Sequence, residues 1–96
     1  MATKKQKKKI VVWQVGKCYL ISTVTTYELG RLIAVTDTEL VLEDASWVAY
    51  TGRFGEALEK GKVDEAEPYP DGQVIVGRGA VVTAVEWQHP LIRKAV

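Results

Sequence analysis

Short runs of β-branched and apolar residues, separated by turn-forming stretches, limit the folds open to this chain. Such runs suit a pleated, half-buried surface. They predict about five strands, at residues 18–24 (CYLISTV), 31–35 (RLIAV), 40–43 (LVLE), 73–77 (QVIVG) and 80–87 (AVVTAVEW). Five short strands are too few for a sandwich, and they leave exposed edges unless the sheet closes or pairs with a neighbour. We therefore expect an all-β fold, a small and strongly bent five-stranded barrel.

A different pattern separates the third and fourth predicted strands. Thr51 can cap a short helix that carries Phe54, Ala57 and Leu58 at i, i+3 and i+4 spacing, with Gly61 as its stop. The following stretch VDEAEPYPDG contains two prolines and ends in a Pro-Asp-Gly turn, which predicts an exposed acidic loop. One helical insertion, at about residues 46–72, is therefore expected within the sheet.

Charge is distributed unevenly along the 96 residues, a length that suits one domain. Five of the 13 basic residues, Lys4, Lys5, Lys7, Lys8 and Lys9, precede Ile10, which leaves eight basic against twelve acidic residues in the rest. The start is thus +5 and the remainder about −4. We expect residues 1–9 to form a basic, disordered arm on a domain of residues 10–96. Such an arm is suited to contact nucleic acid or another polyanion.

Several functional classes find no support in this sequence. No apolar run approaches the roughly 18 residues of a membrane span, so we expect no membrane contact. The single cysteine, Cys18, cannot form an internal disulfide and suits a reducing, cytoplasmic compartment. Cys18 is expected to be a buried, inert thiol, and the lone His89 an exposed residue near the C-terminus. They form no metal-ligand or nucleophile pattern, so we expect no enzyme, metal or cofactor.

Two stretches carry a resemblance to a known family. The segment from Val15, V-G-K-C-Y-L-I and then G-R-L-I-A-V-T-D-T-E-L-V-L-E-D-A, resembles the first Sm motif of the Sm, LSm and Hfq proteins. V-I-V-G-R-G-A-V-V, residues 74–82, resembles the second. The chain is also similar to small Sm-like proteins of bacteriophage origin, through A-S-W-V-A-Y-T-G-R-F.

The resemblance implies an Sm-like barrel that pairs strands between copies to form a homo-oligomeric ring of five to seven subunits. It also implies that two turns hold single-stranded RNA, with Asp37 and Thr38 in one and Arg78 and Gly79 in the other. The sequence departs from the family where an asparagine contacts the base, since Glu39 or Leu40 falls there. Thr38 stands where a stacking side chain is expected.

Two functions therefore stay open. One is a ring that binds single-stranded RNA or another polyanion through these turns and the lysine arm. The other is a structural or assembly ring, for example of a bacteriophage particle, in which Thr36 and Asp37 cap their turn and Arg78 balances the acidic residues. The location would be the cytoplasm, or the virion and host cytoplasm for a phage-encoded protein.

Overall fold

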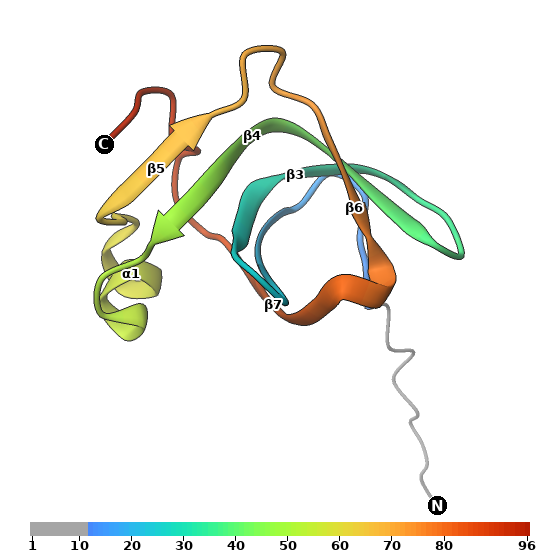
Figure 1. Ribbon diagram of the computed structural model, residues 1–96, viewed down its shortest axis with the longest axis horizontal. Helices are drawn as coiled ribbons and strands as arrows, with labels where there is room; N and C mark the ends of the chain where they lie inside the picture. The colour runs from blue at the N-terminus through green and yellow to red at the C-terminus, as the bar shows by residue number, and fades with distance from the viewer. Residues whose placement is uncertain (1–11) are drawn as a thin grey trace, which may run out of the picture.

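The computed structural model of the chain describes residues 12–96, and the predicted lysine arm lies outside this range. Within it the chain forms six β-strands, one α-helix and one 3₁₀ turn (Figure 1). In chain order these are β2 (Cys18–Thr23), β3 (Tyr27–Val35), β4 (Glu39–Tyr50), α1 (Phe54–Lys60), β5 (Glu65–Pro68), β6 (Val74–Gly77), η1 (Arg78–Ala80) and β7 (Val81–Glu86).

All six strands belong to one antiparallel sheet, which confirms the expected all-β class. Within residues 12–96 the sheet does not close into the expected barrel, because β6 and β7 do not pair with each other. The strand order is β5-β4-β3-β2-β7, and β6 pairs separately with β4. The three residues of η1 join β6 directly to β7. These two strands nevertheless lie at opposite edges of the β2–β3–β4 sheet, since β6 pairs with β4 and β7 pairs with β2. The two predicted site turns lie at the ends of these strands.

Strand β4 is long and has two partners along one edge. Residues 39–42 pair with β6, and residues 46–50 pair with β5. Between these segments Asp44 has a positive φ of 49°, the left-handed conformation that Asp and Asn tolerate better than most residues. On the neighbouring strand, a Cβ atom at Gly30 would lie 3.0 Å from the Ala45 Cβ. Glycine therefore suits this position, where β3 and β4 approach closely.

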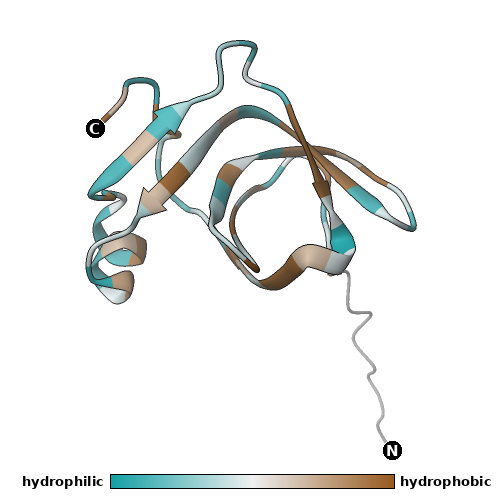
Figure 2. Cartoon of the chain, viewed as in Figure 1, coloured by the Kyte–Doolittle hydropathy of each residue, from teal (hydrophilic) through white to brown (hydrophobic). Residues whose placement is uncertain are grey.

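The sheet buries side chains on both faces, as the alternation of β2 shows. Leu20 packs into one cluster, whereas Tyr19 and Ile21 pack into another on the opposite face. The second cluster also contains Leu32, Leu40, Leu42, Ala45 and Val76. In Figure 2 the apolar residues accordingly occur along β4, β6 and β7 rather than along β5. Each fully buried leucine contributes about 2 kcal/mol to stability through the hydrophobic effect.

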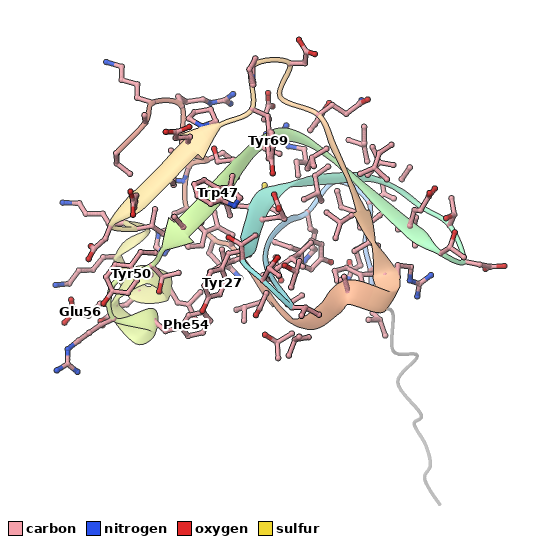
Figure 3. All side chains as sticks on the ribbon, in the orientation of Figure 1. Tyr27, Trp47, Tyr50, Phe54, Glu56 and Tyr69 are labelled. Atoms are coloured by element: carbon pink, nitrogen blue, oxygen red, sulfur yellow. The ribbon has the colours of Figure 1, made fainter. Side chains whose placement is uncertain are left out.

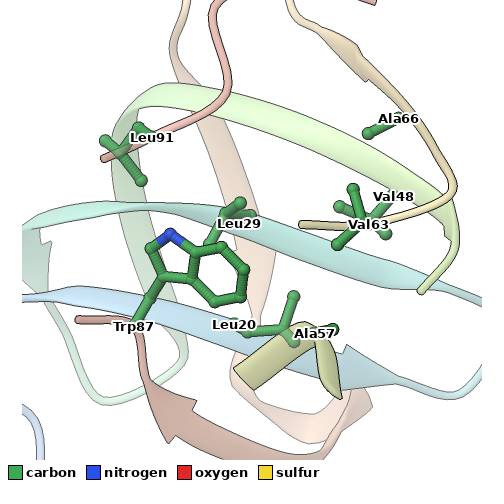
Figure 4. Packing of buried hydrophobic residues seen from close by; sticks show 8 residues of the cluster. All are labelled: Leu20, Leu29, Val48, Ala57, Val63, Ala66, Trp87 and Leu91. Atoms are coloured by element: carbon green, nitrogen blue, oxygen red, sulfur yellow. The ribbon is translucent and has the colours of Figure 1, made fainter. Parts of the chain in front are cut away.

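Helix α1 and the C-terminal segment cover the first cluster. Ala57 and Val63 reach it from the helical side, and Trp87 and Leu91 from the segment after β7 (Figure 4). The helix begins after Arg53, without a side-chain cap, so the predicted cap at Thr51 is wrong. Thr51 instead donates its hydroxyl proton to the Gly52 carbonyl.

Gly61 ends the helix as predicted. It has a φ of 73°, and its N–H donates to the Ala57 carbonyl 2.8 Å away. The space beside it is filled by His89, whose ring would clash with a Cβ at this position. The prediction that His89 is exposed is wrong, because the ring is half-buried and its Nε2 lies 2.6 Å from the Leu58 carbonyl.

Two further predictions differ from the structure. The expected acidic loop contains strand β5, which pairs with the end of β4, so the described sheet has six strands and not five. Strand β4 also continues to Tyr50, into residues assigned to the insertion. Both differences have the same cause, the pairing of β4 with β5. Residues 65–67 have low strand propensity, but the buried Ala66 between two exposed glutamates suits a strand once β4 lies beside it.

Candidate nucleic-acid interface

The turn between β3 and β4 is held by one threonine side chain. Thr36 Oγ1 accepts hydrogen bonds from the backbone N–H groups of Thr38, at 3.2 Å, and Glu39, at 2.9 Å. The Thr36 N–H in turn donates to the Glu39 carbonyl at 2.9 Å. By accepting these two N–H groups, the hydroxyl stabilises the reversal of the chain, so the hairpin closes without the Asn-Gly or Asp-Gly pair that two-residue turns prefer. Of the two predicted capping residues, Thr36 therefore forms the turn.

Arg78 joins this turn to the second predicted turn. Its backbone N–H donates to the Thr38 carbonyl at 2.9 Å, and its guanidinium Nη1 donates to the Thr36 carbonyl. The structure thus brings Asp37 and Thr38 close to Arg78 and Gly79, although 40 residues separate the two turns in the sequence. Asp37, Thr38 and Gly79 are exposed, and Arg78 is half-buried. We call Thr36–Glu39 together with Arg78–Gly79 the turn pair.

The charges of the turn pair do not form a basic site. Within residues 12–96, Arg78 forms no ion pair with Asp37 or Glu39, and its guanidinium donates to a carbonyl oxygen. The prediction that Arg78 balances the two carboxylates therefore does not hold as a direct contact. Two exposed acidic side chains remain at the end of the β3–β4 hairpin, where they repel a phosphate backbone.

The turn pair also lacks a stacking surface. Residues 36–39 are Thr-Asp-Thr-Glu and residues 77–80 are Gly-Arg-Gly-Ala, so no aromatic side chain lies in either turn. Stacking of a base on an aromatic ring contributes roughly 1–3 kcal/mol in single-strand binding proteins. Backbone groups, hydroxyls and carboxylates are what the turn pair can offer a ligand. The predicted lysines, Lys4, Lys5, Lys7, Lys8 and Lys9, lie outside the described residues.

A second polar cluster, which the sequence did not reveal, lies where β4 changes partners. Arg31 Nη1 contacts Asp44 Oδ2 at 2.6 Å and Glu43 Oε2 at 3.1 Å, and Arg93 Nη1 contacts Asp44 Oδ1 at 3.2 Å. The hydrogen bond from Arg31, aided by the charge of Arg93, lowers the pKa of Asp44. Residues 68–72 complete a cleft of about 290 Å³ beside this cluster. Both arginines are paired with carboxylates, so the charge in the cleft lining that has no ion pair among residues 12–96 is the acidic Asp71.

A buried carboxyl group is the other unpredicted feature. Glu28 on β3 is only 9% exposed, and its Oε1 accepts a hydrogen bond of 2.7 Å from the Tyr69 hydroxyl. Burial raises the pKa of Glu28, and the bond from Tyr69 opposes that change. Burial and the adjacent Glu28 also raise the pKa of Tyr69. Glu28 lies on β3, whereas its hydrogen-bond partner Tyr69 lies in the loop after β5, 41 positions along the chain.

Other candidate chemistry in residues 12–96 is limited. No three His, Cys, Asp or Glu side chains in this range are grouped so that they can hold a metal ion. Cys18, predicted to be buried, is half-buried at the start of β2. In the same range, no helix has the length and apolar character needed to cross a membrane.

The turn pair is therefore the candidate site that the sequence predicted, with a geometry that favours turn stability over ligand contact. Comparison of the chain with protein families, with curated proteins and with solved structures finds no match in any of the three.

Proposed function

We propose that the protein is the subunit of an Sm-like homo-oligomeric ring of five to seven copies, and that the ring has a structural or assembly role. The strand pairing supports an Sm-like barrel. Strand β7 pairs with β2, and β6 pairs with β4, so the segment β6–η1–β7 spans both edges of the β2–β3–β4 sheet. In this proposal β2, β3, β4, β6 and β7 form the five-stranded barrel, and β5 and α1 are additions to it.

The observation that carries the proposal is the free edge of each of the last two strands. Among the described residues, β6 pairs only with β4 and β7 only with β2. Ile75 on β6 is 63% exposed, and Val82 on β7 is 64% exposed. Unpaired edges with exposed apolar side chains favour association with other strands. When two different edges of one subunit pair head-to-tail, a closed ring results if the rotation closes.

A structural role follows from the chemistry of the turn pair. In a ring, Asp37 and Glu39 would be repeated in every subunit, so the surface that they occupy would be strongly acidic. The one cation of the turn pair, Arg78, already donates from Nη1 to the Thr36 carbonyl, and it is outnumbered by Asp37 and Glu39. The negative charges of Asp37 and Glu39, repeated around a ring, repel the phosphate groups of a nucleic acid.

Substitution of the edge residues tests this proposal. Val82→Lys and Ile75→Lys place a charge on the free strands, where it disfavours strand pairing between copies. We expect sedimentation velocity to show smaller species for both variants than for the unchanged chain. Val96→Lys, at an exposed valine away from both strands, serves as the control. A full-size assembly in both edge variants would contradict pairing through β6 and β7.

A second candidate function is binding of single-stranded RNA by the ring. It is favoured by one observation, the contact of Arg78 with the Thr36 and Thr38 carbonyls, which joins the two turns that the Sm resemblance assigns to RNA. In this case the lysines of residues 1–9 supply most of the affinity for phosphate. Five lysines give a log–log salt slope of about −3.5 per arm, from roughly 0.7 counterions released per contact.

Titration of oligo-U, oligo-A and duplex DNA at two salt concentrations separates the candidates. The structural ring predicts weak binding that disappears when residues 2–9 are deleted, with little difference between oligo-U and oligo-A, because phosphate contacts do not read bases. Residual affinity in the deletion variant that differs between oligo-U and oligo-A, and that is lost when Arg78→Ala is added, would instead favour RNA binding by the turn pair.

A further inference from the structure

One face of the β4–β5 pair is open and carries both aromatic and acidic side chains. Glu28, Trp47 and Glu67 lie side by side in the strand register across β3, β4 and β5, and Tyr50 lies opposite Glu65. Cross-strand partners project from the same face of a sheet, and so do residues two apart on one strand. The register shift after Val48 therefore places all five of these side chains on one face, which we call the acidic-aromatic face.

The opposite face of the same strands is covered. Val48 and Ala66 belong to the cluster beneath α1 and the C-terminal segment (Figure 4). In contrast, Trp47 is 39% exposed and Tyr50 is 59% exposed, and both project from β4 in Figure 3. Along β5 the exposed Glu65 and Glu67 flank the buried Ala66, and Figure 2 shows the matching change from hydrophilic to apolar and back. Large exposed aromatic side chains on an uncovered strand pair favour contact with a partner.

The carboxylates of the acidic-aromatic face are not neutralised by the rest of the described chain. Within residues 12–96, none of Glu28, Glu65 and Glu67 forms an ion pair, whereas Glu43, Asp44 and Glu86 do. Glu28 is mostly buried, and its one hydrogen bond comes from the neutral Tyr69 hydroxyl. The exposed Glu65 and Glu67 therefore carry the unpaired charge of this face, which favours a positively charged occupant.

We propose that the acidic-aromatic face docks the lysine-rich segment, residues 4–9, of a second copy of this chain. The segment carries five lysines, and the remainder of the chain is about −4, so the charges are complementary. A lysine ammonium binds the faces of Trp and Tyr rings by cation–π attraction, and its methylene stem covers apolar surface. Glu65 and Glu67 would hold the ammonium groups that flank the rings.

The occupant lies on the face and does not extend the sheet. The outer edge of β5 is already paired, since the Val96 N–H donates to the Ala66 carbonyl at 2.9 Å and the Ala66 N–H donates to the Val96 carbonyl at 3.4 Å. An added strand would find this edge occupied. Side-chain contacts of lysines with rings and carboxylates are what the geometry allows.

The position of the described start of the chain points to a second copy as the source. Trp13 packs edge-on against Tyr19 with ring centroids 5.2 Å apart, and the Gly16 N–H donates to the Leu32 carbonyl at 2.7 Å. In Figure 1 this start lies beside β6 and η1, whereas β5 lies at the other end of the molecule. The inference depends on the proposed ring in one respect, that a neighbouring subunit supplies the lysine-rich segment.

Zero-length cross-linking of the full chain tests the contact directly. Equal amounts of ¹⁴N- and ¹⁵N-labelled protein are unfolded and refolded together, then treated with a carbodiimide, which joins a lysine amine to a carboxyl group with loss of water. We expect amide links from Lys4–Lys9 to Glu65 and Glu67 in peptide pairs of mixed isotope. We also expect 1 M salt to suppress them, since screening weakens exposed charge pairs. Links that favour the exposed Glu56 and Glu59 of α1, or only pairs of one isotope, would overturn the proposal.

Affinity measurements add a matched control. A fluorescent peptide of residues 1–11 is titrated onto the full chain and its variants. Glu65→Gln with Glu67→Gln should weaken binding about fivefold, because two exposed charge pairs are lost. Tyr50→Ala should weaken it about threefold through loss of a cation–π contact. Glu56→Gln with Glu59→Gln removes the same charge from α1 and should change the affinity by less than about twofold. Equal losses in both glutamate pairs would show attraction to net charge alone and overturn the site.

The two proposals fail in different ways. A ring in native mass spectrometry without links to Glu65 or Glu67 defeats the docking and leaves the ring. A monomer defeats the ring and, with it, the second copy as the source of the segment.

Discussion

Arg78 directs its backbone N–H and its guanidinium at two carbonyl oxygens of the β3–β4 turn. Arg78→Ala removes the guanidinium bond and leaves the Thr36 carbonyl to water. We expect the free energy of unfolding to fall by about 1 kcal/mol, the usual value of one such hydrogen bond, in urea denaturation. Arg53→Ala, at an exposed arginine before α1, should change it by less than about 0.5 kcal/mol. Unchanged stability with reduced RNA affinity would assign Arg78 to ligand binding instead.

Glu28 makes the stability depend on pH. Burial raises its pKa above the ordinary 4.5, so the folded state binds this proton more tightly than the unfolded state does. Ionisation of Glu28 therefore lowers stability progressively as the pH rises above 4.5 through the folded pKa. Glu28→Gln removes this cost and keeps an oxygen for the Tyr69 hydroxyl.

We therefore expect the variant to gain stability relative to the unchanged chain between about pH 4 and pH 7, in urea denaturation. A constant difference for Glu28→Gln across this range would contradict a raised pKa.

At this scale the sequence predicts local contacts better than distant ones. The Thr36 hydroxyl caps its own turn within three residues, and this behaviour follows from residue type. The Glu28–Tyr69 bond joins residues 41 positions apart, and the ion pairs of Asp44 reach back to Arg31 and forward to Arg93. Such contacts depend on the bend of the sheet, which no local pattern encodes.

Among the elements, β4 decides the shape of the sheet, because it bends between two partners at the point where β3 crosses it closely. Gly30→Ala would place a Cβ 3.0 Å from the Ala45 Cβ and 3.2 Å from its Cα, so the β4 backbone must shift. We expect a loss of about 1–3 kcal/mol in the free energy of unfolding, the usual cost of overpacking.

Gly55→Ala provides the matched control for that measurement. The helical Gly55 has open space at its Cβ position, so alanine there should increase the free energy of unfolding by about 0.5 kcal/mol. Equal effects of the two substitutions would show that the close approach of β3 and β4 does not limit stability.

The elements that sequence reasoning found are those with a strong intrinsic pattern. The five β-branched runs became β2, β3, β4, β6 and β7, and the helix ends at Gly61 as its αL geometry requires. Strand β5 has only one buried residue, Ala66, and it depends on pairing with β4 and with Val96. A strand stabilised mainly by its neighbours carries no signal in its own four residues.

At the scale of the whole molecule, association between copies depends on the distribution of charge and of unpaired strand edges more than on any single residue. The lysine-rich start and the acidic remainder are complementary, and the free edges of β6 and β7 lie on the segment that joins both sides of the sheet. Sequence patterns predicted the charge division, and the Sm resemblance implied that the two turns lie together. They did not predict the acidic-aromatic face, because it depends on a register shift after Val48 that aligns Trp47 with Tyr50.

Native mass spectrometry of the full chain tests the ring most directly. At micromolar concentration we expect one dominant homo-oligomer of five to seven copies, by the Sm resemblance and because the free strand edges favour pairing between subunits. Raised salt should leave this species intact, since strand pairing and apolar contacts are screened little. A dominant monomer at the same concentration would contradict the account.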